Sequence, residues 1–169
     1  AMIEDMDRRL VEALGDSVFG RDSETLEQVV VGKLVSRRLT LATAESCTGG
    51  LISNRITDVP GSSAAFSMGI VSYSNEAKER LLGVPRQLLE DHGAVSDEVA
   101  RAMADGVRAV SGADMGLSVT GIAGPSGGSP QKPVGLVYMA LSSEAETVAR
   151  KHQFSGSRID IKLRTSQAA

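Results

Sequence analysis

The chain has 169 residues, of which 41% are apolar and 23% charged, and its net charge at neutral pH is −3. This size and composition are typical of one compact domain and exclude a disordered or fibrous chain. The negative charge and the 3% aromatic content argue against a polyanion-binding surface and against base-stacking platforms for single-stranded nucleic acid.

The cysteine and histidine content and the hydropathy argue against three further classes: disulfide-linked, metal-binding and membrane or secreted proteins. Cys47 is the single cysteine, so no intrachain disulfide can form, and His92 and His152 offer no clustered metal ligands. No run of about 18 apolar residues and no signal-peptide pattern occur. We therefore expect a soluble cytoplasmic protein with no metal, no cofactor, no nucleic-acid partner and no membrane partner.

The first elements in chain order are helical. Residues 3–14 fit a short helix ended by Gly15, followed by a linker. Asp22 or Ser23 is expected to cap a second helix, whose apolar positions recur at helical spacing: Leu26, Val29, Val30, Leu34 and Val35.

From residue 39 the chain alternates between strands and helices. Strands are expected at 39–44, 64–74, 114–121, 134–143 and 147–154, and helices at 48–59, 75–82, 85–92 and 96–112. The helix at 96–112 should turn an apolar face inward that consists of Val99, Met103, Val107 and Val110. This alternation predicts a mostly parallel sheet with helices on both faces and an antiparallel edge formed by the last two strands.

Ligands of open α/β sheets bind beyond the carboxyl ends of the strands, so the residues that follow the strands are the candidates for a site. Ser46 follows the strand at 39–44 and is expected at the start of a helix near Thr48, where the free N–H groups around Thr48 and Gly49 can stabilise an oxyanion. Gly49 and Gly50 would let a ligand approach the backbone closely. The alternative is that Ser46 or Thr48 is only a helix cap.

Cys47 competes with Ser46 as the nucleophile. A thiol nucleophile needs a base such as histidine, and neither histidine follows a predicted strand. Cys47 is therefore expected to be a packed residue.

Lys78 and Tyr73 follow the second predicted strand and can reach the same crevice. A lysine acts as a base only when it is neutral, which requires burial or a nearby positive charge. Serine–lysine pairs are a variant of the serine–histidine–aspartate triad. The alternative is a solvated Lys78 that pairs with Glu76 or Glu79.

A glycine-rich segment, 121–128, follows the strand that ends in Thr120 and holds four glycines. Its N–H groups, with the hydroxyls of Thr120 and Ser126, could bind an anion. It fits neither the Walker A pattern nor the dinucleotide fingerprint. The alternative is a mobile surface loop.

Several motifs in register resemble one family: "TLATAESCTGG", "GIVSYSNEAKERLLGV", "GAVSDEVARAMADGVR" and "SVTGIAGPSGG". Together they are similar to the CinA C-terminal domain family, which also occurs alone as nicotinamide-nucleotide amidase, from about Leu26 to about Arg164. The resemblance implies a three-layer α/β/α sandwich that converts nicotinamide mononucleotide into nicotinic acid mononucleotide and ammonia.

The resemblance also assigns roles to residues. It implies three catalytic residues, with Ser46 as the nucleophile, Lys78 as its base and Tyr73 close by. The expected substrate-binding residues are Glu45, Thr48, Gly49, Gly50, Thr120, Gly121, Gly124 and Gly127, with Arg158 or Arg164 as a phosphate-binding arginine. Ser157 stands where members of the family often carry an acidic residue.

We expect two segments in the chain, divided at residue 22, and a nucleotide and a second copy of the chain as partners. Residues 1–21 resemble the linker to a nucleotide-hydrolase-like domain in longer members, so the chain is a candidate fragment, with the amidase-like domain at 22–169. A nucleotide substrate and a homo-oligomer, most simply a homodimer, are expected. The alternative function is a non-catalytic nucleotide-sensing or interaction domain of a competence- or damage-inducible protein.

Overall fold

The computed structural model describes residues 2–15 and 18–169. Its centre is a sheet with the strand order β2-β1-β3-β4-β5. The strands are β1 (Leu41–Glu45), β2 (Phe66–Val71), β3 (Met115–Gly121), β4 (Leu136–Ser142) and β5 (Thr147–Gln153). β1 lies between β2 and β3 and is parallel to both, whereas β3, β4 and β5 pair antiparallel in succession. The predicted mixed sheet with an antiparallel edge is confirmed.

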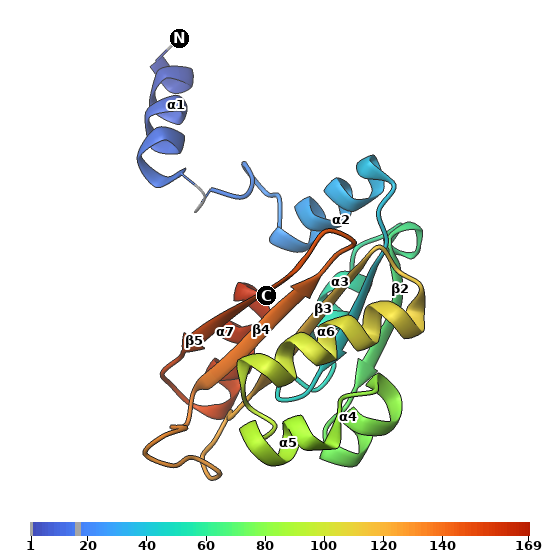
Figure 1. Cartoon of the computed structure of the whole chain (residues 1–169). Coiled ribbons are helices and arrows are strands. Elements are labelled where there is room, and N and C mark those ends of the chain that lie inside the picture. Colours follow the sequence, from blue (N-terminus) through green and yellow to red (C-terminus); the bar gives the residue numbers. More distant parts are fainter. Residues whose placement is uncertain (1, 16–17) are drawn as a thin grey trace.

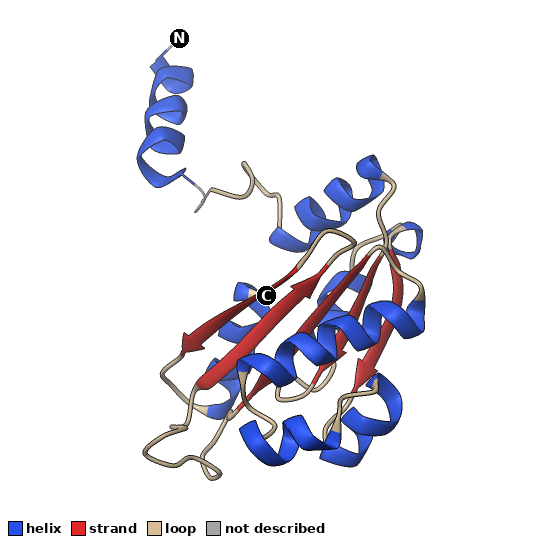
Figure 2. Cartoon of the chain, viewed as in Figure 1, coloured by secondary structure: helices blue, strands red, loops and turns tan. Residues whose placement is uncertain are grey.

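Helices cover both faces of this sheet, which confirms the three-layer architecture (Figures 1 and 2). One face carries α4 (Asn75–Leu82), α5 (Arg86–His92) and α6 (Asp97–Ser111). The other carries α2 (Leu26–Arg37), α3 (Leu51–Thr57) and α7 (Arg158–Ala168). A short 3-10 turn, η2 (Ser62–Ala64), precedes β2.

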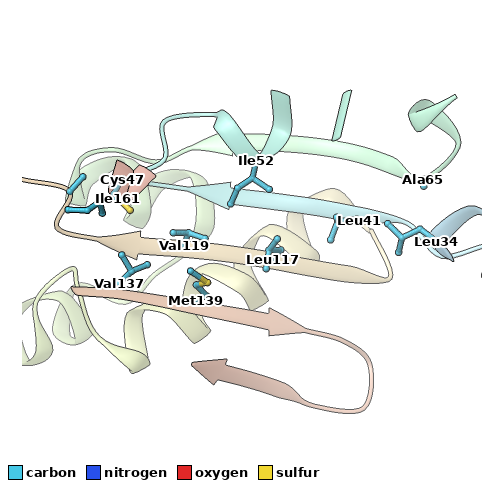
Figure 3. Packing of buried hydrophobic residues seen from close by; sticks show 11 residues of the cluster. Leu34, Leu41, Cys47, Ile52, Ala65, Leu117, Val119, Val137, Met139 and Ile161 are labelled. Atoms are coloured by element: carbon cyan, nitrogen blue, oxygen red, sulfur yellow. The ribbon is translucent and has the colours of Figure 1, made fainter. Parts of the chain in front are cut away.

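Two aliphatic cores fill the spaces between these layers. Figure 3 shows the core beneath α2, α3 and α7, where Leu34, Ile52 and Ile161 pack on Leu117 and Val119 of β3. On the opposite face, the apolar side of α6 packs on the alanines of β1. Val99, Met103 and Val107 are fully buried as predicted, but Val110 is 52% exposed, so its predicted inward orientation is wrong. Val110 lies in the last turn of α6, and its side chain is not part of the core on that face.

Helix starts were predicted less well than helix positions. α2 begins after Thr25, not after Asp22 or Ser23, because Thr25 and Gln28 form a reciprocal capping box. α3 begins at Leu51, so the predicted start near Thr48 is wrong by three residues. Residues 46–50 instead form a turn that includes Gly49 and Gly50 at positive φ, 65° and 96°.

The first helix, α1 (Met2–Leu14), stands apart from the sheet in Figure 1. It carries no buried residue among those described, and the exposed fractions of Ile3 and Met6 are 81% and 58%. The homo-oligomer expectation depends on the family resemblance and on this exposed apolar stripe, and the homo-oligomer stays a prediction. No helix in residues 2–15 and 18–169 is both long and apolar enough to span a bilayer.

Candidate active site

The three parallel strands end at one edge of the sheet, and a cleft of about 350 Å³ opens there. Ser46 follows β1 directly, while Tyr73 and Lys78 follow β2. The segment after β3 supplies the opposite wall, and α7 adds one arginine. The cleft is lined by Ser46, Cys47, Tyr73, Lys78, Ala94, Val95, Thr120, Gly121, Ile122, Ala123, Gly124, Ser126, Gly127 and Arg158.

Ser46 and Lys78 meet at the inner end of the cleft. The Lys78 Nζ donates to the Ser46 Oγ at 3.1 Å and to the Ser72 carbonyl at 2.7 Å. Lys78 is only 1% exposed, and Ser46 is 9% exposed. Lys78 is therefore not the solvated helix residue of the alternative interpretation, and its amine lies within proton-transfer distance of a hydroxyl.

Burial changes the protonation of this lysine. Desolvation lowers the pKa of Lys78 from 10.5 to about 8, because an ammonium loses hydration inside the protein. Both of its hydrogen-bond partners are uncharged oxygens. At pH 7 about a tenth of the molecules then carry a neutral Lys78 amine, which is the form that can accept a proton.

Close packing of two helices places Lys78 this deep. Ser74 caps α4 by accepting from the Ala77 N–H, and Lys78 lies one turn further on. At Gly106, α6 approaches the end of α4 so closely that a Cβ would lie 2.0 Å from the Leu82 carbonyl oxygen. A larger residue at 106 would push α4, and Lys78 with it, away from α6.

Cys47 lies beside the site in an unreactive state. Its side chain is 5% exposed and belongs to the core of Figure 3. Burial raises the pKa of the thiol to about 11, so the thiolate is rare at neutral pH. A Cβ on Gly121 would approach its Sγ to 3.1 Å, so the thiol is enclosed by tight packing. The geometry supports the expectation that Cys47 is a packed residue.

Glu45 lies behind the cleft and does not line it. The carboxylate is 1% exposed and accepts from the N–H groups of Gly50, Ile52 and Ser53 and from the Ser53 hydroxyl, at 2.7–3.1 Å. These are the free donors at the start of α3. The N-terminus of α3 is therefore occupied by Glu45, and the expected contact between Glu45 and substrate is not what the geometry favours.

The turn after Ser46 differs from the expected helix start. The Ser46 N–H donates to the Val119 carbonyl at 3.0 Å, and the Gly49 N–H donates to the Ser46 carbonyl at 3.1 Å. Gly49 is thus not a free donor, contrary to its expected role around an oxyanion. Thr48 is fully buried, and its hydroxyl has no hydrogen-bond partner among the described residues.

The glycine-rich segment is held in place on two sides. The Thr120 hydroxyl donates to the Ala94 carbonyl at 2.7 Å, and Lys132 binds the carbonyls of His92 and Val95. Gly124 and Gly127 have φ of 74° and 88°, which side chains rarely adopt. These bonds tie the loop to the segment between α5 and α6, so it forms a wall of the cleft.

Arg158 lies at the outer end of the cleft, and Arg164 does not reach it. The Arg158 guanidinium donates to the Gly124 carbonyl at 2.8 Å and to the Tyr73 hydroxyl at 2.9 Å. Tyr73 is 60% exposed, and among the described residues its hydroxyl forms a hydrogen bond with Arg158 and none with Ser46 or Lys78. Of the two arginines that sequence reasoning left open, the structure brings only Arg158 into the cleft.

Sequence reasoning did not predict the start of α7, which orients Arg158. Ser157 caps this helix by accepting from the Asp160 N–H, and Asp160 accepts in return from the Ser157 N–H at 2.8 Å. The signal was present as a serine followed three residues later by an acid. No group of three or more potential metal ligands occurs among the described residues.

The fold and the site together define an α/β domain with a buried serine–lysine pair at the carboxyl edge of its parallel strands. The model of one family, the CinA C-terminal domain, matches residues 23–169. The chain belongs to this family.

Known relatives agree with this assignment. A CinA-like protein of Geotalea daltonii is 54% identical over 169 residues, 100% of this chain and 40% of its own length. One from Geobacter sulfurreducens is 55% identical over 158 residues, 94% of this chain and 38% of its own length. This chain thus spans about two fifths of these curated relatives.

Solved structures match the domain over nearly its full length. The competence/damage inducible protein CihA from Agrobacterium tumefaciens has a TM-score of 0.84 and 40% identity, covering 90% of this chain and 93% of that one. A CinA superfamily protein from Escherichia coli has a TM-score of 0.81 and 28% identity, covering 91% of this chain and 92% of that one.

Proposed function

We propose that this domain is an amidohydrolase that converts nicotinamide mononucleotide into nicotinic acid mononucleotide and ammonia. The observation that carries the proposal is the hydrogen bond of 3.1 Å between a buried lysine amine, Lys78, and the hydroxyl of Ser46. A lowered lysine pKa next to a serine is the pairing that nucleophilic acyl transfer requires.

In the proposed reaction the Ser46 Oγ attacks the carboxamide carbon while the Lys78 amine takes the hydroxyl proton. Lys78 then gives this proton to the departing nitrogen, which leaves as ammonia, and an acyl-enzyme ester on Ser46 remains. Water attacks the ester with Lys78 again as the base, which releases the carboxylate product and restores the serine.

The oxyanion of both steps needs N–H donors. The N–H groups of Ser46 and Gly49 are already used within the turn. Among the described residues, the Cys47 N–H makes no bond to another residue's backbone, and Cys47 lines the cleft, so we assign the oxyanion to this donor. This assignment replaces Thr48 and Gly49 as the expected donors.

Ammonia release from nicotinamide mononucleotide tests the proposal. Ser46→Ala and Lys78→Ala should each lower kcat by about 10³-fold or more, and the double variant should be little worse, because the two groups act as a unit. Lys151→Ala, which removes an exposed lysine on β5, is the matched control and should leave the rate unchanged.

Two results would contradict the proposal. Ammonia release that survives in Ser46→Ala would remove the serine from the reaction. A wild-type protein that binds the nucleotide without releasing ammonia would instead support the alternative of a nucleotide-sensing domain.

A further inference from the structure

Ser72 carries a buried hydroxyl that nothing in the described part of the chain binds. The residue is fully buried, and its Oγ has no hydrogen-bond partner among the described residues. A buried hydroxyl without a partner has lost its bonds to water and gained none in return, which destabilises the fold. The Lys78 amine donates to the carbonyl oxygen of the same residue at 2.7 Å, so this hydroxyl belongs to the immediate surroundings of the proposed base.

The sheet register places the Ser72 side chain on the same face as that of Ser46. The Ser72 N–H donates to the Glu45 carbonyl at 2.9 Å, which continues the pairing of β2 with β1 by one residue. Side chains alternate between the two faces of a strand, and Ala44 and Ile70, each two residues before one of the serines, pack in the core on the α6 side. Both serines therefore face the helical layer from which the proposed base projects.

The hydrogen bonds of Lys78 leave one of its N–H groups without an acceptor. An ammonium has three N–H donors, and among the described residues Lys78 uses two, toward the Ser46 Oγ and the Ser72 carbonyl. The neutral amine has two N–H groups and a lone pair. When the lone pair faces the Ser46 O–H, as proton transfer requires, the Ser72 carbonyl accepts one N–H and the other is left over. In both protonation states one donor thus lacks a partner, beside a hydroxyl that also lacks one.

We propose that the Ser72 hydroxyl, after a rotation about its Cα–Cβ bond, accepts the remaining N–H of Lys78 and so fixes the amine with its lone pair toward Ser46. Ser72 is then a positioning residue, because it does not line the cleft and acts on the reaction through Lys78. Without this acceptor the neutral amine would turn its second N–H toward the Ser46 Oγ, and its lone pair would face away from the hydroxyl that must lose a proton. This inference rests on the proposed amidase function, since it concerns the base of that reaction.

Ammonia release from nicotinamide mononucleotide by Ser72→Ala tests the inference. Loss of the acceptor should lower kcat about tenfold and leave KM within about twofold, because the lysine amine turns out of its productive orientation while the contacts to the substrate stay. Ser72→Thr restores a hydroxyl at the same position and should recover kcat to within about threefold of the wild-type value. The split between kcat and KM and the rescue by threonine are results that a merely structural role would not produce.

Thr165→Val is the matched control for Ser72→Ala. Thr165 is also fully buried, and its hydroxyl likewise has no hydrogen-bond partner among the described residues, but it lies on α7 and does not line the cleft. Its removal should change kcat by no more than about twofold. Equal kcat values in Ser72→Ala and Thr165→Val would overturn the proposal, and so would a Ser72→Thr variant that is as slow as Ser72→Ala.

Urea unfolding separates this proposal from the amidase function, because it requires no activity. If Ser72 binds the amine, Ser72→Ala should lower the unfolding midpoint of the wild type but have little further effect in Lys78→Met, which lacks the amine. The effects of Thr165→Val and Lys78→Met should instead add. Additive effects of Ser72→Ala and Lys78→Met would overturn the contact, whether or not ammonia is released. Non-additive midpoints in a protein that releases no ammonia would contradict the amidase function and still support the contact.

Discussion

The inner and outer ends of the cleft differ in their contact with water. At the inner end Lys78 is 1% exposed, whereas at the outer end Tyr73 is 60% exposed and Arg158 is also exposed. Burial is what lowers the pKa of Lys78 to about 8, and an exposed lysine would stay protonated. The proposed proton transfer therefore needs a dry environment, whereas Arg158 and Tyr73 at the rim stay in contact with water.

The largest expected effect is the dependence of kcat/KM on pH, which reports on Lys78 at the inner end of the cleft. Because only the neutral amine accepts a proton, kcat/KM should fall about tenfold for each pH unit below about 8 and level off above it. A rate profile between pH 6 and pH 9.5 measures this. A profile that stays flat down to pH 6 would show that Lys78 is not the base.

The second effect concerns the support of the inner end by Glu45. Glu45→Gln would place an amide NH₂ among N–H donors, so we expect a loss of about 1–3 kcal/mol in the free energy of unfolding. The turn that follows Ser46 should also shift, and kcat should fall roughly tenfold. Denaturant unfolding and ammonia release check the two parts.

Asp58→Asn is the matched control for Glu45, since it changes an exposed carboxylate at the opposite end of α3. In the part of the chain that the structure describes, this carboxylate accepts from the Asn54 side chain alone. It should leave both quantities nearly unchanged. A Glu45→Gln variant that equals Asp58→Asn would mean that the carboxylate does not hold the turn.

A smaller effect is expected at the outer end. Tyr73→Phe removes the hydroxyl that accepts from Arg158 at 2.9 Å, so the guanidinium loses one of its two bonds. KM for nicotinamide mononucleotide should rise about threefold with kcat nearly unchanged, as expected for an exposed hydrogen bond. Steady-state kinetics separate the two constants. A fall in kcat of about a hundredfold would instead place Tyr73 in the proton transfer.

The smallest effect is expected for Cys47. Cys47→Ala should keep kcat within about twofold, because the thiol has a pKa of about 11 and packs in the core. Iodoacetamide should label the native protein slowly, as followed by mass spectrometry. Activity that disappears in Cys47→Ala but persists in Ser46→Ala would assign the nucleophile to the thiol.

Much of the fold was predictable because hydrophobic periodicity determines where strands and helices lie. The strands that begin at Leu41 and Met115 were expected from the pattern alone, as were three of the four residues predicted to face inward from α6. The convergence of Ser46 and Lys78 also follows from topology, since parallel strands bring their carboxyl ends to one edge.

The remaining details depend on contacts that no local pattern contains. α3 starts late because Glu45 turns back to cap it, and an acid at the end of a strand gives no sign of such a partner. The choice between Arg158 and Arg164 depends on how α7 is rotated against the sheet, which the burial of Ile161 and Thr165 determines. The Ser157 capping box is the exception, because a serine followed three residues later by an acid is a local pattern.

The reversal of direction between β3 and β4 has a consequence for how this domain can diversify. Because β4 runs back along β3, residues 122–135 leave and rejoin the sheet at the same edge, where Gly121 pairs with Val137. This connection can lengthen or shorten without any change in strand order, and doubling a loop costs only about 0.6 kcal/mol. The strand ends that hold Ser46 and Lys78 therefore do not depend on the length of this connection.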